Sequence, residues 1–409
     1  MKWPRIIIYS IIIMLILELL KTFVSRQTPA PSYFLAVIIS CIQVIFCLAV
    51  IFFSLSFSLI EKFFRFPFFT VVIWFTVLIS LMECLFVYWY RNPHRMPESL
   101  KESYGFYYDF FDASFIQYER SKAVYDPDLF YKLKPSVKFT FSNCEFSTSF
   151  VTNHQGLRDD PISLSAPEII LIGDSYVMGW GVEEYEAFPA LLEKRTNKNT
   201  LNAGIASYGT ARQLMLLSKL DSSNLRFLII QYCANDYTEN VEFIKNDFKL
   251  PISPQKQYEK VIASYEWTRK YFPGKVFLVT IQAFLKSKIN QILPVFAVAS
   301  ERKNDNGDEL ENALNFAEIL YRSTIDFKKV KVIITRLNAY NFMSNSFIHQ
   351  LKKISNRPPY YERFGKYISI VDLLPVLDKI DYYDLDVHLR PSGHRKVAEA
   401  LFESLKTTH

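Results

Sequence analysis

The stretch "EIILIGDSYVMGWGV", residues 168–182, begins as an apolar run and changes character at Gly173, Asp174 and Ser175. Four consecutive aliphatic residues are typical of a strand that is buried on both faces, as in a parallel sheet. The glycine, the acid and the serine stand where this strand should end. Ligands gather beyond the carboxyl ends of the strands in such sheets, so Ser175 lies where chemistry is expected.

Further runs of the same kind follow along the chain, separated by segments that are long enough for helices. They are "TLNAG" (200–204), "LRFLIIQY" (225–232), "VKVIITR" (330–336) and "YISIVDL" (367–373). This alternation is typical of a parallel sheet with helices on both faces. We therefore predict an α/β domain over residues 168–409, with a three-layer, flavodoxin-like parallel sheet.

The amino-terminal part of the chain contains three long apolar runs, at residues 6–24, 33–60 and 66–90. Each run is long enough to cross a hydrocarbon core of about 30 Å as a helix. We predict that residues 1–92 form an all-α membrane region of three transmembrane helices, followed by a connector with short strands over residues 93–167. With the amino terminus inside, three crossings place the large domain on the extracytoplasmic side, periplasmic or at the cell surface.

Two features of these apolar runs have alternative explanations. The first run also fits a cleaved signal peptide, although no small-x-small cleavage site follows it closely, so an uncleaved span is favoured. Glu83 lies within the third run, where an ionised carboxylate is costly. A protonated or hydrogen-bonded contact between helices explains Glu83 better than a role in moving a substrate.

Charge and composition exclude several functions. The formal net charge of the 409 residues is +6, and the first 92 residues carry four of these charges. The nearly neutral remainder has no basic run of the kind that nucleic-acid binding needs. The five cysteines and six histidines are scattered without metal-ligand spacing. We therefore expect no nucleic-acid partner, no metal and no cofactor.

Four short blocks of the chain contain the residue types of a serine hydrolase. They are Gly173-Asp174-Ser175, Asn202-Ala203-Gly204, Ala234-Asn235-Asp236 and Asp386-Val387-His388. A serine hydroxyl is a poor nucleophile, so it needs a general base, an acid that orients the base, and donors for the oxyanion. His388 and Asp386 have the side chains for the first two roles. Gly204 and Asn235 have N–H groups for the third.

In this order the four blocks resemble the SGNH (GDSL-type) hydrolase family, including its subset with "GDSxxxGxGV" around the nucleophile. The resemblance covers roughly residues 130–406. It implies that Ser175 is the nucleophile and that His388 is the base. It also implies an oxyanion hole made by the backbone N–H groups of Ser175 and Gly204 and by the side chain of Asn235.

The chain departs from the family pattern at two places. Cys233 stands where the third block usually has glycine. The common Asp-x-x-His spacing would need an acid at position 385, where this chain has Leu385. Asp386 lies two residues before His388, and in an extended segment its carboxylate would point to the same side as the imidazole. Asp384 is the reserve candidate for the orienting acid.

The candidate residues also have structural explanations. A serine after a strand most often caps the following helix, and only the four blocks together favour catalysis for Ser175. The Gly-x-Ser-x-Gly elbow of α/β-hydrolases is disfavoured, because Val177 stands at the position of its second glycine. We expect Asn153 and Arg158 to brace the turn upstream of the nucleophile strand, and His394 to be structural.

The expected function is that of a membrane-anchored serine esterase or O-acyltransferase that works through an acyl-enzyme. Its expected substrate is an ester-linked acyl group, acetyl foremost, on an extracytoplasmic glycan, with a membrane acyl-transfer or polysaccharide-synthesis partner. Two alternatives remain open: a lipid esterase or lysophospholipase at the bilayer, and a catalytically inactive SGNH-fold scaffold of a membrane synthesis complex. A His388 far from Ser175 would favour the scaffold.

Overall fold

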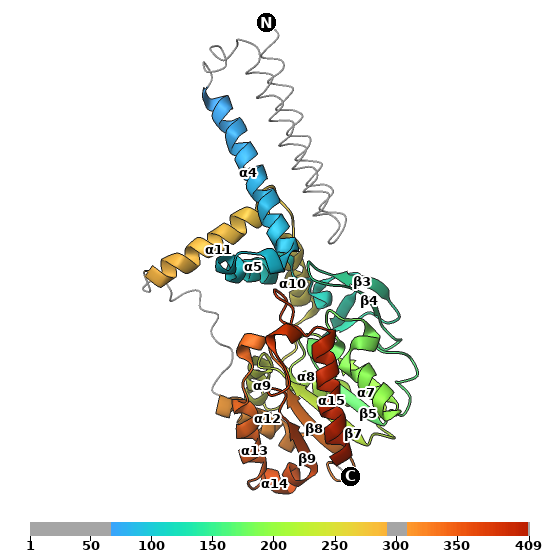
Figure 1. The fold of residues 1–409 in the computed structure, drawn as a ribbon. Coiled ribbons are helices and arrows are strands. Elements are labelled where there is room, and N and C mark those ends of the chain that lie inside the picture. Colours follow the sequence, from blue (N-terminus) through green and yellow to red (C-terminus); the bar gives the residue numbers. More distant parts are fainter. Residues whose placement is uncertain (1–66, 293–308, 408–409) are drawn as a thin grey trace. The chain divides into compact units, whose positions relative to one another are not determined.

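The computed structural model of the chain describes residues 67–292 and 309–407 (Figure 1). The chain divides into two units, each built from several segments. Unit 1 comprises Met1–Ala113, Ser142–Glu145 and Glu266–Val298, and unit 2 comprises Ser114–Phe141, Phe146–Tyr265 and Ala299–His409. The first two predicted spans, residues 6–24 and 33–60, lie outside the described residues.

Unit 1 is helical in the part that the structure describes. Its helices are α4 (Pro67–Arg91), α5 (Lys101–Tyr107) and α11 (Lys275–Ile292), with short helical turns at Pro93–Arg95, Glu98–Leu100 and Tyr108–Asp112. The predicted third span, residues 66–90, corresponds to α4. Among the described helices, none is both long and apolar enough to cross a membrane.

Glu83 is buried between two helices of unit 1, with 2% of its surface exposed. Its Oε2 accepts the backbone N–H of Phe277 at 2.9 Å, and its Oε1 accepts that of Val276 at 3.3 Å. The hydroxyl of Tyr271 donates to Oε1 at 3.1 Å. The first N–H groups of a helix have no partner within it, so Glu83 of α4 satisfies the start of α11. The prediction of a hydrogen-bonded contact between helices is confirmed.

Unit 2 contains a five-stranded sheet in the order β6-β5-β7-β8-β9, with every neighbouring pair parallel. The strands are β5 (Ile169–Gly173), β6 (Thr200–Gly204), β7 (Phe227–Tyr232), β8 (Lys331–Arg336) and β9 (Ile368–Val371). β5, β6 and β7 are completely buried. The apolar runs of β5 and β7 predicted this, whereas β6 also buries Thr200 and Asn202. β5 lies between β6 and β7, so the loops after these three strands meet at one edge of the sheet.

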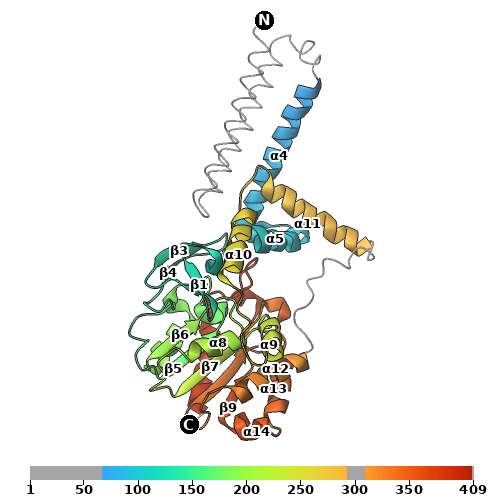
Figure 2. The same cartoon turned by 180° about the vertical axis from the view of Figure 1, so that it is seen from behind.

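Helices cover both faces of this sheet, as the alternation along the chain predicted. Figure 1 looks onto the face covered by α7 (Phe188–Thr196) and α15 (Pro391–Thr407), and Figure 2 onto the face covered by α8 (Thr210–Leu217), α12 (Glu309–Arg322) and α13 (Ser346–Ser355). Alternate residues of β5 point to opposite faces: Leu171 packs with the first group and Ile172 with the second. The remaining helices of unit 2 are α6 (Ser175–Met178), α9 (Asp236–Lys245), α10 (Gln255–Thr268) and α14 (Tyr360–Arg363).

The predicted connector does contain short strands, but its boundaries differ from the prediction. The strands are β1 (Ala123–Asp126), β2 (Phe130–Leu133), β3 (Lys138–Ser142) and β4 (Ser147–Val151), which form two two-stranded sheets. Most of the connector from Ser114 onward belongs to unit 2. Conversely, Glu266–Val298 lies inside the predicted catalytic domain but belongs to unit 1, because α11 packs against α4 and α5.

Candidate active site

Ser175 is the first residue of α6, directly after the end of β5. Asp174 caps this short helix, because its side chain accepts the backbone N–H of Tyr176 at 3.0 Å. At Gly173 a Cβ atom would lie 2.2 Å from the side chain of Val177, so only glycine permits this tight turn. The backbone N–H of Ser175 has no hydrogen-bond partner among the described residues.

The predicted nucleophile, base and acid come together at this edge of the sheet. The Oγ of Ser175 lies 2.7 Å from Nε2 of His388. Nδ1 of His388 lies 2.5 Å from Oδ1 of Asp386. The side chain of His388 is 13% exposed and that of Asp386 is 2% exposed, so the acid is shielded from water. This is the spatial arrangement of a Ser-His-Asp triad. The separation of His388 from Ser175 that would favour an inactive scaffold is not observed.

Asp386 reaches the imidazole through a turn rather than through the extended segment that we expected. Its Oδ1 also accepts the backbone N–H of His388, two residues further on, at 3.0 Å. An aspartate that bonds to the backbone two residues on forms its own compact turn. The reserve candidate Asp384 binds Arg390 instead, at 3.0 Å on the surface. Among the two acids, the structure places Asp386 behind the histidine.

Two aromatic residues that the sequence argument missed hold the triad in place. Nε1 of Trp180 donates to Oδ2 of Asp386 at 3.1 Å, and its ring stacks on the imidazole of His388 with centroids 4.9 Å apart. The hydroxyl of Tyr176 donates to the carbonyl of Val387 at 2.9 Å. The sequence does contain a signal for Trp180, which stands between Gly179 and Gly181 in the stretch quoted at the start. In the structure both of these glycines have positive φ.

Arg158 and Asn153 brace the surrounding loops, as predicted. Arg158 is 1% exposed, and its guanidinium donates to the carbonyls of Val182 at 2.7 Å and Ser149 at 3.0 Å, and also to that of Gly179. Burial lowers the pKa of Arg158 to about 10. Asn153 accepts two backbone N–H groups of the turn that follows it. Arg158 therefore fixes the loop that carries Trp180, and Asn153 fixes the turn that leads to Arg158.

The structure contradicts the oxyanion role that the resemblance implied for Gly204. Its backbone N–H donates to Oδ1 of Asn202 at 3.1 Å. A Cβ atom at this position would lie 2.4 Å from the backbone nitrogen of Met178. Gly204 therefore allows β6 to approach α6 closely, and its N–H group is already in use.

Two other residues at this edge offer N–H groups that are not already in use. Asn235 stands at the start of α9, is exposed, and its side chain has no hydrogen-bond partner among the described residues. Ser207, which the sequence argument missed, lies in the loop after β6 with φ of 61°. Its backbone N–H also has no partner within the described ranges, and its Oγ accepts from Gln117 at 3.1 Å. A serine gives no sequence signal for this left-handed conformation, which glycine usually adopts.

Buried titratable groups lie behind the site. Burial is the largest cause that raises the pKa of Asp174, Asp236 and Cys233. Burial also lowers the pKa of His394 to about 3, and its Nδ1 accepts the N–H of Phe188 at 3.2 Å. His394 is thus a neutral structural histidine, as predicted. Within residues 67–292 and 309–407, no group of three or more histidine, cysteine or acidic side chains could hold a metal ion.

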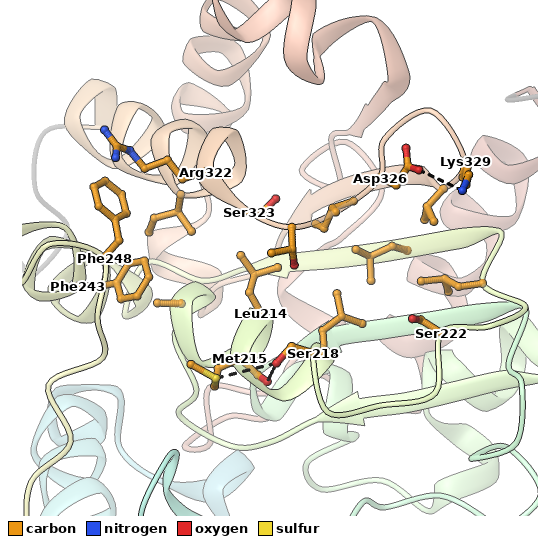
Figure 3. A pocket seen from close by; sticks show the side chains of 18 of the residues that line it. Leu214, Met215, Ser218, Ser222, Phe243, Phe248, Arg322, Ser323, Asp326 and Lys329 are labelled. Carbon is orange, nitrogen blue, oxygen red and sulfur yellow. Dashed lines mark hydrogen bonds and ion pairs between the residues drawn. The ribbon is translucent and has the colours of Figure 1, made fainter.

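Two cavities lie at opposite edges of the sheet of unit 2. A polar cavity of about 230 Å³ lies at the carboxyl edge, where Asn235 and Ser207 form part of its wall. An apolar cavity of about 580 Å³ lies at the amino edge, next to the segments that lead into β7 and β8 (Figure 3). None of the triad residues lines either of these cavities.

Comparison with known proteins gives a likeness in structure alone. No family model matches the chain, and no curated protein matches its sequence. The chain is similar to a putative lipolytic protein of the G-D-S-L family from Desulfitobacterium hafniense, with 14% identity over 57% of this chain and 97% of that one and a TM-score of 0.29. It is also similar to TesA, with 13% identity over 59% and 99% of the two chains and a TM-score of 0.29. A third similar structure is the lipase Lip_vut3 from a goat rumen metagenome, with 14% identity over 57% and 96% and a TM-score of 0.27.

Proposed function

We propose that the chain is a serine-dependent hydrolase or acyltransferase of the SGNH type that acts on acyl esters. The observation that carries this proposal is the chain of contacts from Ser175 through His388 to Asp386, with separations of 2.7 Å and 2.5 Å. A hydroxyl within hydrogen-bond distance of a base, with the base held by a buried acid, is the arrangement that makes serine a nucleophile.

The reaction follows from this geometry. Oγ of Ser175 bonds to the acyl carbon while its proton moves to Nε2 of His388, and Asp386 stabilises the imidazolium that forms. The bond between the acyl carbon and the alcohol oxygen then breaks, and His388 returns the proton to the departing alcohol. The acyl group is left on Ser175. Water or an acceptor hydroxyl then attacks the acyl carbon while its proton moves to Nε2 of His388. The bond between the acyl carbon and Oγ of Ser175 breaks, and His388 returns the proton to Oγ. Attack by water gives hydrolysis, and attack by an acceptor hydroxyl gives transfer.

The negative charge that develops on the acyl oxygen needs donors that are free before the reaction. We assign this role to the backbone N–H of Ser175, the backbone N–H of Ser207 and the side chain of Asn235. These groups come from the loops after three adjacent strands, and none has a hydrogen-bond partner among the described residues. Donors held in place before the reaction stabilise an oxyanion at little reorganisation cost.

The finer proposal concerns the substrate and its place in the cell. We infer an acyl ester of an extracytoplasmic glycan, acetyl foremost, with the chain anchored in a membrane by its amino-terminal apolar runs. The polar cavity beside Asn235 supports a hydroxyl-rich substrate. The apolar runs at residues 6–24 and 33–60 of the sequence support the anchor. A membrane acyl-transfer or polysaccharide-synthesis partner remains part of this proposal.

A fluorophosphonate probe tests the reaction class. We expect the probe to label the full-length wild-type protein and to fail with Ser175→Ala, because the probe reacts only with an activated serine. The matched control is Ser218→Ala, since Ser218 lines the cavity at the opposite edge of the sheet and should keep full labelling. Equal labelling of Ser175→Ala and wild type would refute the assignment of the nucleophile.

Mass spectrometry tests the substrate. Cell-surface glycans should differ in acetyl content between cells that carry the wild-type protein and cells that carry Ser175→Ala. Purified protein should also turn over an acetylated glycan faster than a long-acyl lipid. The reverse preference would support the lipid esterase and contradict the glycan.

A further inference from the structure

The polar cavity lies between the two strand ends that flank the candidate nucleophile. β6 and β7 border β5 on its two sides, and the loops that follow them form the cavity walls. The polar wall residues are Ser207, Arg212, Asn235, Thr238, Glu239 and Glu242. A ligand in this cavity would therefore lie against Asn235 and Ser207, which follow the two strands that border the strand of Ser175.

The back of the cavity is rigid. Arg212 and Glu239 form an ion pair of 2.5 Å, with side chains that are only 15% and 16% exposed. Oε1 of Glu239 also accepts the backbone N–H of Arg212 at 3.2 Å, and the guanidinium lies 5.2 Å from the ring centroid of Tyr208. A Cβ atom at Gly209 would lie 2.7 Å from the same Oε1, so this glycine leaves room for the carboxylate. The wall is thus formed before any ligand arrives.

The open side of the cavity presents both hydrogen-bond donors and acceptors. Thr238 and Glu242 are exposed, and their side chains have no hydrogen-bond partner among the described residues. The hydroxyl of Ser207 accepts from Gln117, which leaves its hydrogen free to donate. A ligand hydroxyl both donates and accepts, so it can pair with such a mixture.

We propose that this cavity binds the alcohol part of the ester, as one sugar ring of an acylated glycan, and thereby determines substrate specificity. The inference rests on the proposed function and specifies which part of the substrate these residues hold. A volume of about 230 Å³ is below the range of about 300–1,000 Å³ that is usual for drug-sized ligands, so the cavity takes a single compact group. Leu250, Pro251 and Ile252 complete the wall and can contact the apolar face of a sugar ring. A long acyl chain is disfavoured, because it would remove water from Thr238, Glu242 and Asn235 without replacing their hydrogen bonds.

The test compares three esters in the full-length protein: a mono-acetylated methyl glucoside, p-nitrophenyl acetate and p-nitrophenyl octanoate. The variants are Thr238→Val and Glu242→Gln, and the control is Lys245→Gln, an exposed position on the same helix that does not line the cavity. We expect each cavity variant to lower the kcat/KM for the glucoside ester relative to p-nitrophenyl acetate by about three- to tenfold, the value of one hydrogen bond. The control should leave this ratio unchanged.

The outcomes separate this inference from the proposed reaction. An unchanged ratio in both cavity variants, or a ratio of octanoate to acetate that falls instead, would overturn the sugar site. Binding of the acetylated glucoside to Ser175→Ala by ligand-observed NMR, and its weakening by Thr238→Val in that background, would support the site even if the protein hydrolysed no ester. Absent fluorophosphonate labelling alongside retained sugar binding would refute the proposed reaction and leave the cavity assignment standing.

Discussion

The polar and the apolar cavity described above lie at opposite edges of one sheet and differ in both size and chemistry. The amino-edge cavity is larger, at about 580 Å³ against about 230 Å³, and none of the triad residues lines either cavity. Its wall is mainly apolar, with Leu214, Leu228 and Ile319 among the lining residues. The carboxyl-edge cavity includes Asn235 and Ser207, two of the residues to which we assign the oxyanion role. The direction of the strands therefore marks the candidate site better than the volume of a hollow does.

The chemical difference between the two cavities follows from which ends of the helices lie at each edge of the sheet. At the carboxyl edge, the helices α6 and α9 begin, and their first N–H groups need acceptors. At the amino edge, α8 and α12 end, and their side chains fill the space between helix and sheet. Figure 3 shows Arg322 there beside Phe248, and the guanidinium lies 4.1 Å from the ring centroid. Arg322 also pairs with Glu318 at 2.6 Å, so its charge is already compensated.

The largest expected effect separates the two acids near the end of the chain. Asp386→Asn should lower kcat by up to about 10⁴-fold, because the amide no longer stabilises the imidazolium and favours the wrong tautomer. Asp384→Asn should change kcat by less than about threefold, since Asp384 forms an exposed pair with Arg390, and such pairs have small energetic value. Steady-state kinetics on p-nitrophenyl acetate measures both. A greater loss in Asp384→Asn would restore the reserve candidate.

A substitution at the amino edge should affect stability and leave the chemistry intact. Leu228 is completely buried and lines the larger cavity. Leu228→Ala should lower the free energy of unfolding by about 3 kcal/mol, through lost burial and a larger void. Urea unfolding measures this change, and fluorophosphonate labelling of the folded protein should stay at the wild-type level. Lost labelling with unchanged unfolding would show that the amino edge takes part in the reaction.

The packing behind the carboxyl edge should give a pH dependence of stability. The pKa of His394 falls from 6.5 to about 3 on folding, because burial disfavours the charged imidazole. Between these values the unfolded chain binds more protons than the folded chain, so stability falls as the pH is lowered from 6.5 towards 3. At pH 5 the loss is about 2 kcal/mol. Between pH 7 and pH 5, the free energy of unfolding measured in urea should fall by about 2 kcal/mol more in the wild type than in His394→Leu. Equal losses in the two proteins would show that folding does not lower the pKa of His394.

The smallest expected effect concerns the aromatic residue beside the triad. Trp180→Phe keeps a ring against His388 but removes the N–H that donates to Asp386. A lost hydrogen bond to a charged group should reduce kcat by about tenfold, with a smaller change in KM. The kinetic pH profile should also shift, because the histidine and its carboxylate are held less firmly. A change in KM alone would mean that Trp180 contacts substrate rather than positioning the triad.

The sequence was most informative where a residue type allows few alternatives. Short runs rich in β-branched residues, separated by segments long enough for helices, predicted the five strands, because this alternation is typical of a parallel sheet covered by helices. The order of the four blocks brought Ser175, His388, Asp386 and Asn235 into consideration, and the first three do lie together. The short strands before the sheet were also predicted, because alternating polar and apolar residues bounded by turn residues are a local signal.

The errors arose where a role depends on neighbours that are distant in the sequence. The family resemblance implied that Gly204 is an oxyanion donor, but its N–H group donates to the side chain of Asn202. The spacing of residues in the sequence does not reveal this hydrogen bond. Ser207 adopts a glycine-like conformation that only the surrounding loop imposes. The boundaries of the units shifted for the same reason, because α11 packs on helices that lie some two hundred residues earlier in the chain.

By itself, the sequence determined the layered α/β sheet and the candidate nucleophile, base and acid, because hydrophobic periodicity and residue chemistry are local properties. Only the tertiary structure decided that Asp386 rather than Asp384 stands behind His388, that Trp180 holds both of them, and that a polar cavity adjoins Asn235. These features depend on distances between side chains from separate strands and loops. Such distances are fixed by how the helices pack on the sheet, and no single stretch of the chain contains that information.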